Sequence, residues 1–160
     1  SEVIILGAGG AGRAAAVQAL RSGCRSLTIV NRNPERLAKL IEAINPIAQE
    51  RTIPLVGKAP DDPTLKIPEG ALLINATSLG LKPDDPLPLP ANALSKSLAL
   101  YDMVYNPPQT ALMQTIESLG GHAANGLSML VYQGVRALEI WTDHPVNPDT
   151  MDRAARSAIA

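Results

Sequence analysis

Three glycines near the start of the chain have the spacing of a phosphate-binding turn. The segment GAGGAG at residues 7–12 places Gly7, Gly9 and Gly12 in the pattern G-x-G-x-x-G. Gly7 permits a tight turn, and Gly9 lets the backbone approach a pyrophosphate without a Cβ in the way. Gly12 lets a helix pack closely on the neighbouring strand. The three glycines therefore predict a dinucleotide or a related nucleotide ligand; a purely structural glycine turn is the alternative.

The segments on either side of this turn are those that such a site requires. Residues 3–6 (VIIL) are typical of a buried strand, and the alanine-rich residues 11–22 favour a helix. A helix that begins at the turn directs free backbone amides and the positive end of its dipole at the ligand. This strand–turn–helix context makes the glycine pattern more specific than the same letters alone.

A second polar segment indicates which dinucleotide the site prefers. Residues 27–30 (LTIV) are typical of a second buried strand, which ends at NRNPER, residues 31–36. Enzymes that prefer NAD usually place Asp or Glu here, where the carboxylate accepts hydrogen bonds from the ribose hydroxyls. Asn31 stands there instead, and Arg32 and Arg36 can bind the 2′-phosphate that a carboxylate would repel. The favoured cofactor is NADP, and the alternative is that both arginines are solvated surface residues.

The composition is that of a globular domain without a nucleic-acid or membrane partner. With 160 residues, of which 46% are hydrophobic and 18% charged, the chain can bury a core as one domain. A net charge of -1 and the absence of Phe argue against nucleic-acid binding. No apolar run approaches the length of a membrane span, and no signal peptide precedes the first strand. Cys24 is the single cysteine, so we expect no intrachain disulfide and no metal site. Together these features predict a soluble, cytoplasmic protein.

Short apolar runs alternate with helical stretches along the chain, which predicts βαβ units. The expected fold class is α/β, a Rossmann-type, doubly wound and mostly parallel sheet with helices on both faces, in one domain over residues 1–160. Eight of the 14 prolines lie between residues 54 and 90, which favours loops there. Asn33 is the expected N-cap of the second helix. The expected strands are 3–6, 27–30, 53–56, 71–74, 98–103 and 122–124, and the expected helices are 11–22, 34–44, 109–118, 127–141 and 149–158.

Further polar segments follow the later strands, at the edge of the sheet where ligands bind in open α/β folds. Thr77 and Ser78 follow the fourth strand, where they could contact a cofactor or serve as turn and capping residues. Asp102 lies at the end of the fifth strand, where a carboxylate bonded to neighbouring amides is favoured over a catalytic acid.

Taken together, these segments resemble the NADP-binding domain of the shikimate dehydrogenase family. The resemblance covers most of the chain and depends on several ordered motifs, which is far more specific than a glycine turn. The motifs are GAGGAGRA at 7–14, NRNPER at 31–36, INATSLGL at 74–81, DMVYNPPQTALM at 102–113 and NGLSMLVYQG at 125–134.

The resemblance implies a role for individual residues of these motifs. Cofactor-binding residues would be Gly7, Ala8, Gly9, Gly10 and Ala11 at the pyrophosphate, Asn31, Arg32, Asn33 and Arg36 around the 2′-phosphate, and Thr77, Ser78, Met103 and Gly126 toward the nicotinamide half. Tyr105 and Gln133 would contact a hydroxyacid substrate across an interdomain cleft.

In the family, an N-terminal substrate domain supplies a catalytic Lys and Asp, and NADPH reduces 3-dehydroshikimate to shikimate. The chain begins at the first Rossmann strand, so no catalytic residue is assigned within it, and residues 142–160 are expected to form a helical extension that faces the substrate domain. The alternatives are a quinate/shikimate dehydrogenase, which often prefers NAD, and a non-catalytic NADP-binding module. A methyltransferase that uses S-adenosylmethionine is disfavoured, because these enzymes normally place a carboxylate where Asn31 stands. The sequence leaves the oligomeric state open.

Overall fold

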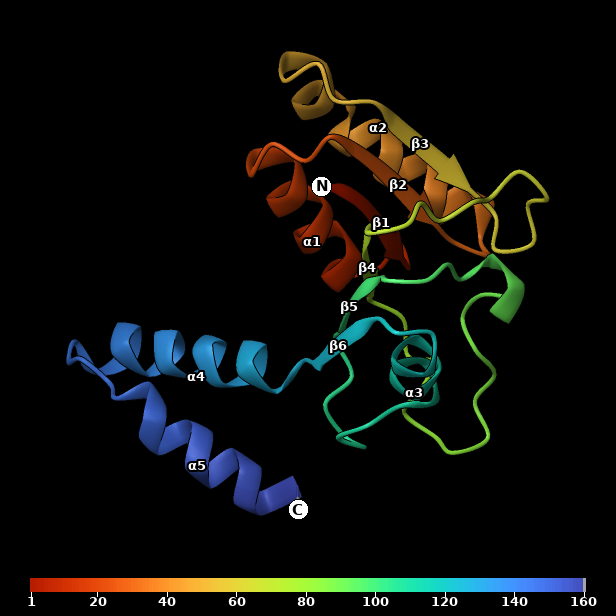
Figure 1. Cartoon of the computed structure of the whole chain (residues 1–160). Coiled ribbons are helices and arrows are strands. Elements are labelled where there is room, and N and C mark those ends of the chain that lie inside the picture. The colour runs from red at the N-terminus through yellow and green to blue at the C-terminus, as the bar shows by residue number, and fades with distance from the viewer. Residues whose placement is uncertain (160) are drawn as a thin grey trace.

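Six strands, five α-helices and one 3-10 turn make up the fold in a computed structural model that describes residues 1–159 (Figure 1). In chain order the elements are β1 (Glu2–Leu6), α1 (Gly10–Arg21), β2 (Ser26–Val30), α2 (Pro34–Glu50), β3 (Leu55–Lys58), β4 (Leu72–Asn75), η1 (Ala91–Ala93), β5 (Ala99–Asp102), α3 (Ala111–Ser118), β6 (His122–Asn125), α4 (Leu127–Thr142) and α5 (Pro148–Ile159). The expected α/β class is confirmed.

The strands form one parallel sheet in the order β3-β2-β1-β4-β5-β6. Strands β2 and β3 therefore lie on one side of β1, and β4, β5 and β6 lie on the other side. The carboxyl ends of β1, β2 and β4 meet where this order reverses, as the pairing of Leu6 with Val30 and with Asn75 shows. In open α/β sheets this reversal point is where ligands bind.

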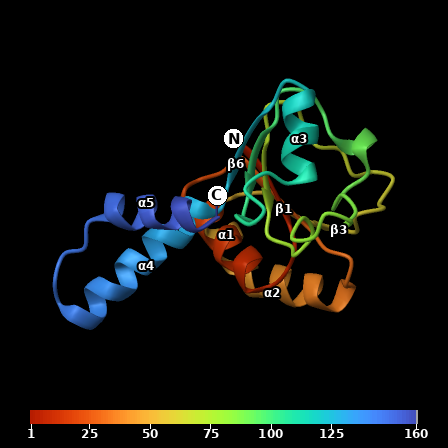
Figure 2. The same cartoon turned by 90° about the horizontal axis from the view of Figure 1, so that it is seen from below.

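Alternate residues of β1 enter different layers, because side chains of a strand point to opposite faces. Val3 and Ile5 pack in the apolar cluster that contains residues of α1 and α2. Ile4 and Leu6 pack in a second cluster with residues of α3. Helices therefore cover both faces of the sheet, as expected for a doubly wound fold (Figure 2).

Most element boundaries differ from those expected by one or two residues, and the largest difference is at the end of α2. Helix α2 runs to Glu50 instead of ending near residue 44, although Pro46 lies inside it. Pro46 removes one backbone donor, but Leu40, Ile44 and Ala48 share the buried stripe of the helix, and this packing carries the helix past the proline.

Strand β3 begins at Leu55, two residues later than expected. Its register follows from pairing with β2, where Leu55 lies opposite Leu27. Gly57 faces α2, and a Cβ there would lie 3.2 Å from Leu37 Cγ. Glycine at this position lets β3 and α2 approach closely, a tertiary feature that the residue pattern of a short strand does not reveal.

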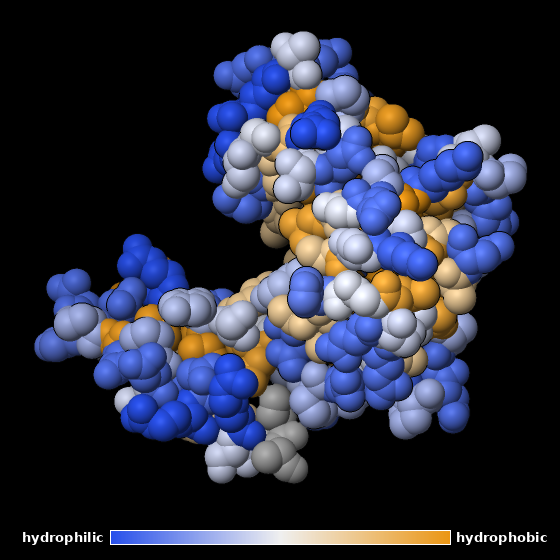
Figure 3. Space-filling view, viewed as in Figure 1, coloured by the Kyte–Doolittle hydropathy of each residue, from blue (hydrophilic) through white to orange (hydrophobic). Residues whose placement is uncertain are grey.

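Helices α4 and α5 pack against each other and project from the body of the domain (Figures 1 and 2). Figure 3 shows a recess between this hairpin and the part of the body that carries α1. Large apolar side chains stay exposed on α4, with Trp141 at 78% and Ile140 at 65%. Helix α5 lies in the segment that was expected to form a C-terminal extension. None of the helices formed by residues 1–159 has the length and hydrophobicity of a membrane span.

Candidate nucleotide-binding site

Two glycines of the turn after β1 are required by packing. Gly7 has φ +105°, and a Cβ there would lie 2.8 Å from the carbonyl oxygen of Ala76. A Cβ at Gly12 would lie 2.1 Å from the carbonyl oxygen of Gly7. These contacts are closer than side-chain carbons tolerate, so both positions need glycine whether or not a ligand binds.

Gly9 and Gly10 differ from their neighbours because no packing contact explains them. A Cβ built at either position would meet no atom within 4 Å. Gly9 is the N-cap of α1 with φ -84°, which side chains adopt freely, and no side chain caps the helix. The first amides of α1 therefore lie beside open space, an arrangement suited to an anion.

A cavity of about 240 Å³ opens at the carboxyl ends of β1, β2 and β4. The glycine turn, the β2–α2 turn and the residues after β4 all contribute to its lining, which includes Gly9, Asn31, Arg32, Arg36, Thr77 and Ser78. The fold thus brings together three segments that the sequence analysis had singled out separately. Asn33, the fourth residue expected around the 2′-phosphate, is not among the lining residues of this cavity.

Asn31 and Asn33 hold the two turns in place. The side-chain oxygen of Asn31 accepts a hydrogen bond from the Ala8 amide at 3.2 Å, and its Nδ2 donates to the carbonyl oxygen of Asn33 at 2.8 Å. Asn33 Oδ1 accepts from the Arg36 amide at 2.9 Å, which confirms the expected N-cap. Asn31 therefore fixes the glycine turn relative to the turn that carries Arg32 and Arg36.

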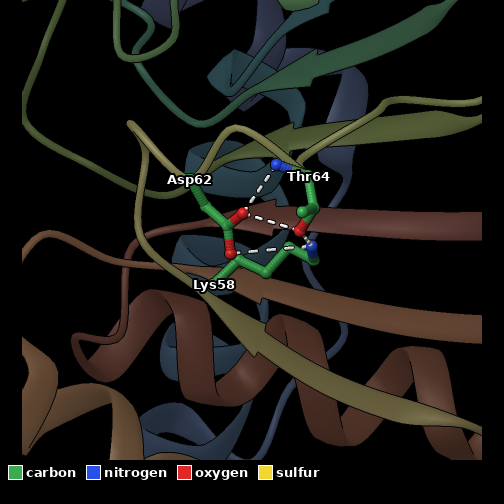
Figure 4. Close-up of polar contacts among 3 residues, drawn as sticks. All are labelled: Lys58, Asp62 and Thr64. Carbon is green, nitrogen blue, oxygen red and sulfur yellow. Dashed lines mark hydrogen bonds and ion pairs between the residues drawn. The ribbon is translucent and has the colours of Figure 1, made fainter.

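The loop after β3 is fixed by a small polar cluster (Figure 4). Lys58 Nζ lies 3.6 Å from Asp62 Oδ2, and both the amide and the hydroxyl of Thr64 donate to Asp62 Oδ1, at 2.7 and 2.6 Å. Lys58 also donates to the Thr64 hydroxyl. The hydrogen bonds from Thr64, aided by Lys58, lower the pKa of Asp62. This cluster closes the loop that places Pro60 in the lining of the cavity.

A buried polar network lies at the ends of β4 and β5. Asp102 and Asn75 are fully buried and stand opposite each other on neighbouring strands, and Asn75 Nδ2 donates to Asp102 Oδ1 at 2.9 Å. Asp102 also accepts from the Val104 amide at 3.1 Å and from the Thr110 hydroxyl at 2.7 Å. The favoured interpretation of Asp102, a carboxylate held by neighbouring donors, is confirmed. Asn75 and Thr110 belong to the motifs at 74–81 and 102–113, but their role in this network was not predicted; an Asn ending an apolar strand was the available signal.

The ionisation of Asp102 should make the fold less stable as the pH rises. Burial raises the pKa of Asp102 above 3.8, although Thr110, Val104 and Asn75 oppose this effect. The folded state therefore binds the Asp102 proton more tightly than the unfolded state does. The resulting contribution to the free energy of unfolding is fully present below about pH 3.8 and is lost as the pH rises through the folded-state pKa. Relative to Asp102→Asn, the wild-type free energy of unfolding is expected to fall across this interval.

Urea unfolding of the wild type, Asp102→Asn and Asp102→Ala at several pH values would test the network. Asp102→Ala leaves buried donors unpaired and is expected to cost about 2–4 kcal/mol. Asp84→Asn, at an exposed loop carboxylate, is the matched control. If the stability difference between the wild type and Asp102→Asn stayed constant with pH, the raised pKa would be contradicted.

A second cavity, of about 600 Å³, lies beside the first and shares Ala76, Thr77 and Ser78 with it. Met103 and Tyr105 also line it. The Thr77 hydroxyl is engaged locally, because it donates to Asn75 Oδ1 at 2.7 Å and accepts from the Leu79 amide at 3.1 Å. Turn chemistry, one of the two interpretations of Thr77, is therefore present, while no hydrogen bond of the Ser78 side chain occurs within residues 1–159.

Gly126 supports this second cavity from behind. It caps α4, and a Cβ there would lie 2.3 Å from the carbonyl oxygen of Met103. The Gly126 amide donates to the carbonyl oxygen of Val104 at 3.2 Å. Glycine at this position lets the start of α4 pack directly against the backbone of Met103, just after β5.

Comparison with known proteins matches these features to one family. Family models described as "Shikimate / quinate 5-dehydrogenase" and "Shikimate 5'-dehydrogenase C-terminal domain" match residues 1–55 and 126–156. A protein of Desulforamulus reducens named "Shikimate dehydrogenase (NADP(+))" is 37% identical in an alignment of 165 positions that covers 98% of this chain. The chain belongs to the shikimate dehydrogenase family. It spans about half the length of the curated relatives it matches, 54% in this case.

Solved structures of the shikimate dehydrogenase family and of a related reductase have the same fold. Shikimate 5-dehydrogenase from Thermus thermophilus, in complex with NADP(H) and shikimate, has a TM-score of 0.77 and 36% identity over 98% of this chain and 54% of its own. The ligand-free 5-ketofructose reductase of Gluconobacter sp. strain CHM43 has a TM-score of 0.82 and 34% identity over 99% of this chain and 56% of its own.

One residue that the family resemblance implies at the substrate is not in the lining of either cavity. Gln133 is exposed on α4 and is absent from the lining of both cavities, whereas Tyr105 lines the second. The two side chains therefore do not share either of these cavities. The role of Gln133 at the substrate stays a prediction.

Proposed function

We propose that this chain is the NADP-binding domain of a shikimate dehydrogenase-like oxidoreductase. The observation that carries the proposal is the lining of the first cavity, where Arg32 and Arg36 lie with the open amide end of α1, and where Asn31 replaces a carboxylate at the end of β2. Neither arginine takes part in an ion pair within residues 1–159. Their guanidinium groups are therefore available to a 2′-phosphate.

The residues divide along the dinucleotide by their place in the two cavities. The amides of Gly9, Gly10 and Ala11 at the start of α1 would bind the pyrophosphate. Arg32 and Arg36 would bind the 2′-phosphate, with Asn31 and Asn33 holding the turn that presents them. The second cavity would receive the nicotinamide half, and its lining includes Thr77, Ser78 and Met103, with Gly126 behind Met103.

In the whole protein, the reaction would be the reduction of 3-dehydroshikimate to shikimate. The bound nicotinamide supplies the hydride, and the chain binds and orients the cofactor. A general acid must protonate the oxygen that gains charge, and we assign this role to a part of the protein outside residues 1–160. The buried, unpaired Cys24 supports a reducing compartment, the cytoplasm.

Titration calorimetry of the 160-residue chain would test the proposal. The chain is expected to bind NADP(H) more tightly than NAD(H) and to show no turnover of shikimate. Equal affinity for the two cofactors would contradict the assignment of the arginines, and absence of binding to either would contradict the proposed function. Turnover by the whole protein with shikimate, quinate or 5-ketofructose would identify the substrate, and no turnover with cofactor binding intact would favour a non-catalytic NADP-binding module.

Gln133 provides a separate test of the substrate side. In the whole protein, Gln133→Ala is expected to raise KM for shikimate or lower kcat, because loss of a side-chain hydrogen bond costs about 0.5–3 kcal/mol. The affinity for NADP should change little, because Gln133 lines neither cavity of the candidate cofactor site. Gln114→Ala, at an exposed position of α3, is the control. A loss confined to the NADP parameters would place Gln133 at the cofactor instead.

A further inference from the structure

Three positively charged side chains line a shallow groove between α1 and α2. The groove, of about 300 Å³, is lined by Arg13, Arg36 and Lys39, together with Gly9, Gly10 and Leu40. Arg13 comes from the beginning of α1, and Arg36 and Lys39 lie three positions apart on α2, so they share one face of that helix. Two helices that are distant in sequence thus present their cations to one space.

These three cations form no ion pair within residues 1–159. The lining of the groove contains no Asp or Glu, and α1 has none along its length. Glu35 and Glu42 lie about one turn before and after Lys39 on α2, yet neither pairs with Arg13, Arg36 or Lys39. Like charges around one groove repel one another and concentrate anions there. A bound dianion would relieve the repulsion.

The groove is continuous with the first cavity. Ala8, Gly9 and Arg36 line both spaces, so the Arg36 side chain stands at their boundary. The space at this boundary is open, because a Cβ at Gly9 or Gly10 would meet no atom within 4 Å. An anion held by Arg36 is therefore within the field of Arg13 and Lys39 as well as Arg32.

We propose that Arg13 and Lys39 complete, with Arg36, a phosphate subsite in this groove. The guanidinium groups can donate paired hydrogen bonds to phosphate oxygens, and the Lys39 ammonium adds a point charge. The phosphate is either the 2′-phosphate of the dinucleotide, in which case the inference rests on the proposed function, or a separate phosphate ion beside it. Preference for the phosphorylated cofactor would then depend on cations of both helices, beyond the β2–α2 turn.

Titration calorimetry of the 160-residue chain with 2′,5′-ADP, 5′-AMP and inorganic phosphate would test the subsite. Arg13→Ala and Lys39→Ala are each expected to weaken 2′,5′-ADP binding about 3- to 10-fold, while 5′-AMP binding changes less than about twofold. Arg21→Ala and Arg51→Ala, near the far ends of α1 and α2, remove the same charge without touching the groove. All variants are compared at one ionic strength, because exposed charges are screened by salt.

The pattern of losses identifies the source of the phosphate. Losses confined to 2′,5′-ADP assign the subsite to the cofactor. Weakened binding of inorganic phosphate to the NADP-saturated chain assigns it to a separate anion. The inference is wrong if Arg13→Ala and Lys39→Ala match their controls in the titrations with 2′,5′-ADP and with inorganic phosphate. It is also wrong if the wild type binds neither of these two ligands. Arg32→Ala in the same series separates the cases, since a loss of 2′,5′-ADP binding in this variant alone would leave the proposed NADP function standing.

Discussion

Gly9→Val is expected to fold and to lose most of its affinity for NADP. The φ and ψ of Gly9, -84° and -168°, suit any residue, and a Cβ there would meet no protein atom within 4 Å. The backbone and the space around the Cβ therefore tolerate a side chain, but that side chain fills the space beside the first amides of α1. Because several charge-assisted hydrogen bonds would be lost together, we expect NADP to bind at least about 100-fold more weakly.

Two variants on the same helix make this result interpretable. Ala14→Val adds a side chain at an exposed position of α1 outside both cavities and should bind NADP normally. Gly12→Ala, by contrast, should destabilise the fold, because its Cβ would lie 2.1 Å from the Gly7 carbonyl oxygen. Thermal unfolding and calorimetric titration of each variant would separate the two effects. Normal NADP binding by Gly9→Val would contradict the placement of the pyrophosphate beside Gly9.

Much of the fold could be predicted because its determinants are local. The apolar runs of β1 and β2, the glycine turn and the Asn33 cap are all readable within a few residues of sequence. The end of α2 and the register of β3 could not be predicted in this way. The first depends on packing of Ala48 against the sheet, and the second on contact of Gly57 with α2. Both are tertiary contacts that override local propensity.

The residues of the candidate site could be predicted where they belong to one sequence motif. They could not be predicted where contacts join residues of different segments. The sequence indicated Gly9, Arg32 and Arg36 through the spacing of two short segments. The polar network was not predicted, because the contact of Asn75 with Asp102 appears only when β4 and β5 lie side by side, and that of Thr110 only when the N-cap of α3 lies against the end of β5. Arg13 and Lys39 escaped for the same reason, since each is an ordinary surface residue of its own helix until α1 and α2 pack together.

Arg32→Ala is expected to weaken NADP binding about 10- to 100-fold and to leave NAD binding almost unchanged. This range follows from the loss of one or two charge-assisted hydrogen bonds of about 1.5–3 kcal/mol to a phosphate that only NADP carries. Arg32 is exposed, has no ion-pair partner within residues 1–159 and lines the same cavity as Arg36. Its removal should therefore cost little stability, and the loss should appear in the binding constant alone.

The decisive comparison is between the two cofactors, measured on one preparation of each variant. Arg25→Ala removes the same charge from an exposed position just before β2, at the opposite end of the strand from the cavity, and should affect neither cofactor. Arg36→Ala should resemble Arg32→Ala if both guanidinium groups bind one phosphate. Equal losses of NADP and NAD affinity in Arg32→Ala would mean that Arg32 contacts a group common to both cofactors, and the assignment of the 2′-phosphate to the β2–α2 turn would be wrong.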